Sequence, residues 1–228
     1  MRHGNATDTS SDAVDIAAGV VNLAALESVE ASTPGTKSAW CATYLPLPKG
    51  AKHLGAPLPP FVNVTDAVGR QGERCVVVLA AMFDPTLGSD HEYALAVAAY
   101  LDTVLQPGSK EQFTVIIDVR GDPDEVWPNT AATKMLPGMR AIASLLFTAY
   151  PDALLQIVLT PVPWFATVIW RAVEPLLGRE VAAKTFMLSG PDSRTAPMPE
   201  DFDRFVDAPN RDILAAHREK YRKSGVQG

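Results

Sequence analysis

The chain has 228 residues, a length that suits one domain with an additional terminal segment. Hydrophobic residues make up 47% of the sequence, which is enough to bury a sizeable core. The formal net charge of -6 at pH 7 argues against general nucleic-acid binding, because that function requires a concentrated basic surface. We therefore expect no nucleic-acid partner.

The sequence shows no sign of export or of membrane insertion. No segment approaches the roughly 20 consecutive apolar residues that cross a bilayer, and the polar stretch 7–12 replaces an apolar signal-peptide core. The two cysteines, Cys41 and Cys75, form no disulfide framework, and Cys75 lies in an apolar run where a buried thiol is expected. These features predict a cytoplasmic protein whose membrane contact is at most peripheral.

Residues 1–61 differ from the rest of the chain. A short helix is expected over residues 13–29, and Pro34 with Gly35 ends it. Several prolines between residues 46 and 60 then oppose regular structure. We predict that residues 1–61 form a flexible, proline-rich leader and that residues 62–228 fold as one domain.

The first part of this domain alternates between strand and helix patterns, as α/β proteins do. Apolar runs predict buried strands over residues 75–81 and 113–119. Between them, Ser89-Asp90-His91-Glu92 has the pattern of a capping box and opens a helix that reaches about Leu105.

A long helix is expected over residues 131–149, because apolar residues recur there at helical spacing. Asn129 is expected to cap its N-terminus. Pro137 and Gly138 lie inside the pattern and are expected to kink or delay the helix.

Two further strands, over residues 154–160 and 185–188, are predicted on either side of an aromatic helix that starts at Pro163. A last helix is expected over residues 211–222, capped by Asn210. Together these elements predict an α/β fold in which helices cover a mixed, mostly parallel sheet, and the aromatic helix lies over one face.

The aromatic helix is the most informative segment, because it holds two Trp and one Phe beside several aliphatic residues. Only Arg171 and Glu174 carry charge, so the helix is apolar over most of its circumference. Such a helix is buried in a core, lies in a membrane interface or covers an apolar cavity. Pro163 favours a defined first turn, and Pro175 bends or ends the helix. The helix is therefore expected to be rigid in its middle and flexible at its ends.

The order of elements between residues 72 and 190 resembles the CRAL-TRIO lipid-binding domain. The resemblance rests on the corner Tyr150-Pro151-Asp152, on Pro163 that follows Tyr150 by 13 residues, and on Lys184 another 21 residues on. Residues 113–121 are similar to the family's strand that ends in Asp-x-x-Gly. The resemblance implies that the aromatic helix is the mobile gate of a lipid pocket.

By this resemblance, one face of the strand 113–119 points into the pocket, and strand alternation makes that face wholly apolar. Such a pocket suits a hydrocarbon chain or a sterol- or terpenoid-like molecule. The expected lipid-pocket residues are Phe113, Val115, Ile117, Val119, Trp164, Phe165, Val168 and Ile169.

Residues for a lipid headgroup are only partly retained. By resemblance to phosphatidylinositol-transfer members, Asp152 and Lys184 are the candidate headgroup residues, whereas Ala153 replaces an arginine and Val181 a threonine. A lysine offers a point charge, whereas an arginine holds phosphate with two parallel hydrogen bonds. We therefore expect no selectivity for phosphoinositides.

Two departures from the family leave a second function open. The N-terminal helical bundle and the Leu-Pro…Gly-Gly closing segment common in the family are not visible in the sequence. Such a truncated pattern also resembles divergent, BCH-like CRAL-TRIO modules, which bind small GTPases or other signalling proteins. The basic last helix is either a solvated terminal helix or a site of transient contact with anionic membrane.

Catalytic patterns are missing: the sequence has no Gly-x-Ser-x-Gly elbow, no Gly-rich phosphate loop and no Cys/His metal spacing. Asp84, Asp118, Asp122 and Asp124 sit near strand ends, but no nucleophile or base accompanies them. We expect a non-catalytic protein without cofactor or metal. It binds, and by extension transfers, a lipid or other small hydrophobic molecule, or it is a scaffold that binds a protein partner.

Overall fold

The computed structural model describes residues 61–86, 88–90, 93–94, 96–97, 100–101, 111–149, 152–163, 170–171, 174, 179–191 and 193–224. The strands in this part of the chain are β1 (Val62–Val68), β2 (Arg74–Leu79), β3 (Phe113–Asp118), β4 (Leu154–Val162) and β5 (Thr185–Ser189). The helices are α4 (Ala132–Ala149), α6 (Arg179–Ala183) and α7 (Ala208–Ser224), with short 3-10 turns η3 (Ala80–Met82) and η5 (Glu200–Arg204).

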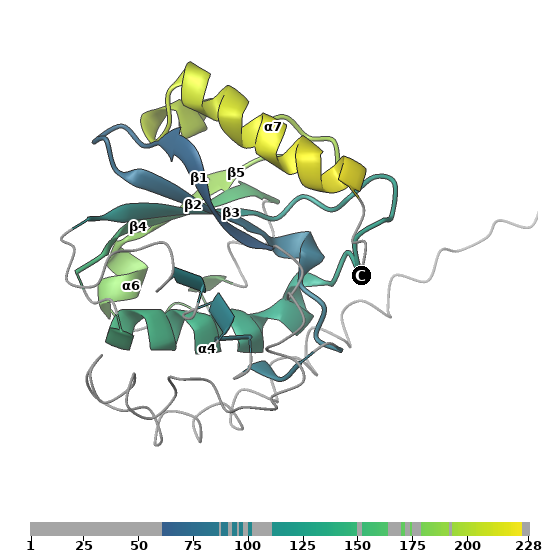
Figure 1. Ribbon diagram of the computed structural model, residues 1–228, viewed down its shortest axis with the longest axis horizontal. Coiled ribbons are helices and arrows are strands. Elements are labelled where there is room, and N and C mark those ends of the chain that lie inside the picture. The colour runs from purple at the N-terminus through teal and green to yellow at the C-terminus, as the bar shows by residue number, and fades with distance from the viewer. Residues whose placement is uncertain are drawn as a thin grey trace, which may run out of the picture. The chain divides into compact units, whose positions relative to one another are not determined.

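The five strands form one sheet in the order β1-β2-β3-β4-β5. β1 is antiparallel to β2, and all other neighbours are parallel. Parallel neighbours that follow one another in the chain require right-handed crossovers, which return over the same face of the sheet. Accordingly α4 and α6 lie on one face, and α7 lies on the opposite face (Figure 1). The predicted α/β fold with a mixed, mostly parallel sheet is confirmed.

The predicted strands differ from the observed ones only at their ends, and β1 is an addition. β2 stops at Leu79, because the next residues turn into η3. β4 continues to Val162, two residues beyond its predicted end. β1 follows directly on Phe61 and shows clear alternation of buried and more exposed side chains, as an edge strand does.

Two predicted helix caps are wrong. The side chain of Asn129 does not cap α4: its Oδ1 accepts from the Asp122 N–H at 2.7 Å and its Nδ2 donates to the Asp122 carbonyl at 3.1 Å. α7 starts at Ala208, and the Asp207 carboxylate accepts a hydrogen bond from the N–H of Asn210 at 3.1 Å. Asp207 is therefore the N-cap, and Pro209 is tolerated because first-turn N–H groups have no helical partner.

The core lies on both faces of the sheet. Beneath α7, Leu214 packs with Phe202 and Val206 in the same buried cluster as the strands. Cys75 is fully buried, as the sequence predicted, and burial raises the pKa of its thiol to about 12. The thiol therefore stays protonated and unreactive at neutral pH.

An aromatic cluster closes the carboxyl end of β2. The ring centroids of Phe61 and Phe83 are 5.9 Å apart, and that of Tyr93 lies 5.4 Å from Phe61 and 4.4 Å from Phe83. All three side chains are buried, and the Tyr93 hydroxyl donates a hydrogen bond to the Asp84 carbonyl at 2.6 Å. This cluster holds the chain after β2 in a fixed position.

Candidate functional site: an apolar cavity between the sheet and α4

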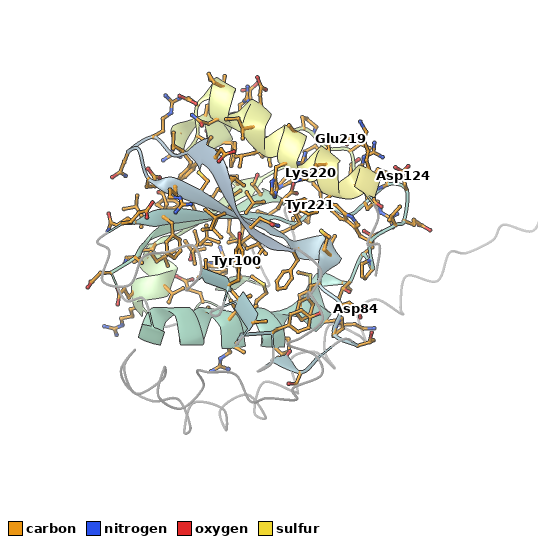
Figure 2. All side chains as sticks on the ribbon, viewed as in Figure 1. Asp84, Tyr100, Asp124, Glu219, Lys220 and Tyr221 are labelled. Carbon is orange, nitrogen blue, oxygen red and sulfur yellow. The ribbon has the colours of Figure 1, made fainter. Side chains whose placement is uncertain are left out.

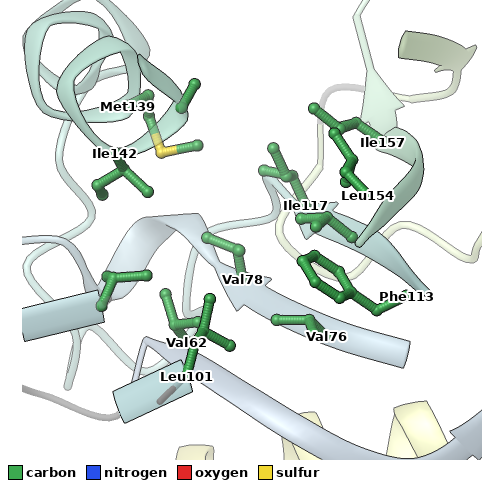
Figure 3. A pocket seen from close by; sticks show the side chains of 13 residues that line it. Val62, Val76, Val78, Leu101, Phe113, Ile117, Met139, Ile142, Leu154 and Ile157 are labelled. Carbon is green, nitrogen blue, oxygen red and sulfur yellow. The ribbon is translucent and has the colours of Figure 1, made fainter. Parts of the chain in front are cut away.

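The structure contains a cavity between the sheet and α4 (Figure 3). Strands β1 to β4 form one wall, and side chains of α4 and of residues 97 and 101 form the other. The lining residues that the structure describes share one property, the lack of any polar side chain: Val62, Val76, Val78, Val97, Leu101, Phe113, Val115, Ile117, Met139, Ile142, Ala143, Leu154 and Ile157. These side chains therefore offer dispersion contacts and no hydrogen bond.

Strand register explains why the sheet wall is apolar. Val76 of β2 pairs with Val115 of β3, and Val115 pairs with Ile157 of β4. Because side chains alternate between faces along each strand, residues in register point to the same face. An apolar row therefore runs across three adjacent strands at the level of Val115.

The cavity is small in this conformation, with a volume of about 70 Å³. The wider hollow around it holds about 620 Å³ of atom-free space, but that figure includes open solvent. An engineered cavity of roughly 150 Å³ takes up benzene, so the enclosed space cannot hold a lipid chain without widening. The volume of about 70 Å³ is therefore the one that limits the size of a bound ligand.

Three of the expected pocket residues on β3, namely Phe113, Val115 and Ile117, line this cavity. Val119 is not among the lining residues: it follows β3, and its N–H donates to the Thr160 carbonyl at 3.1 Å. The four expected gate residues, Trp164, Phe165, Val168 and Ile169, lie outside the described residues.

Sequence reasoning missed the wall that α4 contributes. Met139 and Ile142 belong to the apolar spacing that predicts a helix over residues 131–149, but periodicity does not show which surface the apolar side faces. Val62 was missed because β1 was not identified as a strand. The alternation of apolar and polar residues from Val62 to Thr65 was the available signal.

The two candidate headgroup residues have different partners. The Lys184 ammonium donates to the Leu154 carbonyl at 3.0 Å and pairs with Glu180 at 3.2 Å, which ties α6 to the start of β4. Asp152 is exposed, and its backbone carbonyl accepts a hydrogen bond from Gln112 at 3.3 Å. Lys184 thus has a structural role at this position.

Asp118 lies on the other face of the sheet, at the end of β3, and it is paired with arginines. It is 2% exposed, and the Arg120 guanidinium holds its carboxylate through Nε at 3.0 Å and Nη2 at 2.7 Å. Arg218 of α7 approaches the same carboxylate, with Nε at 3.8 Å from Oδ2. This buried group links the sheet to α7.

A more exposed charged group continues the network at the end of α7. Arg222 pairs with Asp124 and with Glu219, which lie on the same side of the molecule (Figure 2). Among the described residues, no three His, Cys, Asp or Glu side chains are placed to hold a metal ion. The charged residues of this region therefore bind one another and join the loop after β3 to α7.

The sequence that forms this architecture matches a known protein family. A profile of the CRAL/TRIO domain matches residues 61–208, well over half of the chain. The chain belongs to the CRAL/TRIO domain family. Members of this family bind lipophilic small molecules and are generally non-catalytic. No curated protein matched the chain in sequence.

The CRAL/TRIO match contains all the described lining residues of the cavity, which lie between Val62 and Ile157. It ends at the first residue of α7, so that nearly all of this helix lies beyond the matched region. In the part of the chain that the structure describes, no helix has the length and apolar character of a membrane span.

Proposed function

We propose that this CRAL/TRIO domain binds a lipid or another small hydrophobic molecule in the cavity between the sheet and α4, without catalysing a reaction. The observation that carries the proposal is the fully apolar lining of the cavity. Burying an unpaired polar group costs several kcal/mol. The ligand therefore places its hydrocarbon part inside and keeps any polar group at the mouth.

The ligand class is a neutral or weakly polar molecule with a hydrocarbon chain or a sterol- or terpenoid-like body. A phosphoinositide headgroup finds little support, because Lys184 already bonds to Leu154 and Glu180. Asp152 is also unfavourable for phosphate binding, because both groups are negative. Selectivity for phosphoinositides is therefore not part of the proposal.

Binding requires the cavity to expand, since ligand pockets usually measure several hundred Å³. The gate inferred from the sequence, with Trp164, Phe165, Val168 and Ile169, remains part of this proposal. As an extension of this proposal, the protein transfers the ligand between membranes through transient contact with their surfaces.

A second candidate function is a protein-interaction scaffold of the BCH-like type. Two observations favour it: the cavity of about 70 Å³ is smaller than a usual ligand site, and the headgroup positions 153 and 181 hold Ala and Val. In a scaffold the same side chains act as core, and the cavity never opens.

Native mass spectrometry after organic extraction separates the two functions, with a Val115→Trp variant as the test of the site. The larger side chain fills the cavity, so we expect bound lipid to fall at least about tenfold, in line with a lost binding site. Val126→Trp is the matched control, because it makes the same exchange at a side chain that is 46% exposed. Circular dichroism shows whether each variant is folded.

Equal lipid recovery from Val115→Trp and the wild-type protein would remove Val115 from the site. If the folded wild-type protein carries no lipid and takes up no fluorescent fatty acid, the scaffold becomes the better proposal. A pull-down with small GTPases then tests it directly.

A further inference from the structure

The helix that forms one wall of the cavity has a proline in its interior. α4 runs from Ala132 to Ala149, and Pro137 lies inside it. Proline has no N–H to donate to the carbonyl of Thr133, four residues earlier, and its ring crowds that carbonyl. Interior prolines are a main cause of local weakness and bending in helices.

Gly138, which directly follows this proline, lies against a buried ring. It is so close to Phe83 that a Cβ on it would be 2.7 Å from the ring atom Cζ. Phe83 is 1% exposed and belongs to the aromatic cluster with Phe61 and Tyr93. Just before α4, the Thr130 hydroxyl donates to the Phe83 carbonyl at 2.6 Å. These contacts hold the residue before α4 and the position of the proline close to the aromatic cluster.

The part of α4 after this point carries all of its contacts with the cavity. Met139, Ile142 and Ala143 line the cavity, and each of them follows Gly138 in the chain. Figure 3 shows Met139 and Ile142 facing the side chains of the sheet across the hollow. A bend at Pro137 therefore displaces the lining side chains, which lie farther along the helix, more than Gly138, which lies beside the bend.

We propose that Pro137 and Gly138 form a hinge about which the second part of α4, residues 139–149, swings away from the sheet and widens the cavity. The cavity volume of about 70 Å³ is too small for a lipid chain, so one wall of the cavity has to move. The role of the hinge in ligand entry rests on the proposed function, whereas its opening is a property of the ligand-free protein too.

The test is a Pro137→Ala variant of the full chain, which restores the missing helical hydrogen bond. Pro209→Ala is the matched control: that proline is exposed and lies in the first turn of α7, where its missing N–H has no helical partner. Hydrogen exchange of the ligand-free proteins measures the opening of the second part of α4. We expect Pro137→Ala to slow exchange in residues 139–145 by about tenfold relative to wild type, and Pro209→Ala to leave it unchanged.

Uptake of cis-parinaric acid, a fluorescent fatty acid, tests whether the hinge controls ligand entry. We expect the association rate to fall by about tenfold in Pro137→Ala, in step with the exchange rate, and to be unchanged in Pro209→Ala. Thermal unfolding confirms that both variants are folded.

Each combination of results is decisive. Unaltered exchange in Pro137→Ala overturns the hinge, whatever the fatty acid does. Slower exchange with an unaltered association rate overturns its role in ligand entry. Slower exchange in a protein whose wild type carries no lipid and takes up no fatty acid supports the hinge and overturns the proposed function.

Discussion

The carboxylate of Asp118 is the most consequential buried charge in the described part of the domain. It is 2% exposed and neutralises Arg120 at hydrogen-bond distance, with Arg218 close by. The arginines also hold backbone carbonyls: Arg120 donates to Ala196 at 2.7 Å and Arg218 to Gly121 at 2.7 Å. Three separate segments therefore meet at one carboxylate.

We predict that Asp118→Ala lowers the free energy of unfolding by about 3–5 kcal/mol, because it leaves two buried guanidinium groups without their counter-charge. Glu125→Ala is the control, because Glu125 pairs with Arg194 at 3.0 Å but is 75% exposed. Exposed pairs contribute at most about 1 kcal/mol. Urea unfolding of both variants measures the difference, and equal effects would contradict the role of Asp118.

At the scale of single elements, α7 shows how one helix presents two unlike sides. Leu214 is 5% exposed and packs in the core between α7 and the sheet, whereas its neighbour Ile213 is 40% exposed. We predict that Leu214→Ala costs about 2–5 kcal/mol of unfolding free energy, as deletion of a buried aliphatic side chain does. Ile213→Ala should cost less than about 1 kcal/mol. Similar costs in chemical denaturation would mean that α7 does not dock on the sheet in solution.

The elements that the sequence predicts well are those with strong local signals. The run 75–81 is apolar throughout and the run 113–119 is mostly apolar, and both contain buried parallel strands. α7 begins two residues before its predicted cap, Asn210, because Asp207 caps it and Pro209 is compatible with a first helical turn. Asn129 has the residue type of a cap, but its side chain closes the loop at Asp122.

On the sheet side, the sequence predicted the cavity residues of β3 but not those of the other strands, and it predicted none of those on α4. Alternation alone places Phe113, Val115 and Ile117 on one face of β3. Which helix covers that face depends on crossover geometry and on contacts distant in sequence, so Met139 and Ile142 were not assigned to the site. The cavity volume depends on close packing, which no residue pattern records.

For the whole molecule, the sheet separates two layers with different roles. The cavity face carries the proposed ligand site, lined by residues such as Val115. The opposite face carries the core under α7 and the charged group around Asp118. Sites that are well separated and share no partners usually have additive effects on stability. Variants under α7 should therefore leave ligand binding intact.

This separation gives a prediction for stability in the presence of ligand. At a free concentration of cis-parinaric acid near 100 times its Kd, we expect the unfolding free energy of the wild-type protein to rise by about 2.7 kcal/mol, the gain for a ligand that binds only the folded state. Leu214→Ala should gain the same increment from a lower starting point, because Leu214 lies across the sheet from the cavity. Val115→Trp should gain none, because its cavity is filled. Urea unfolding with and without the fatty acid measures all three increments, and loss of the increment in Leu214→Ala would show that the two faces of the sheet are coupled.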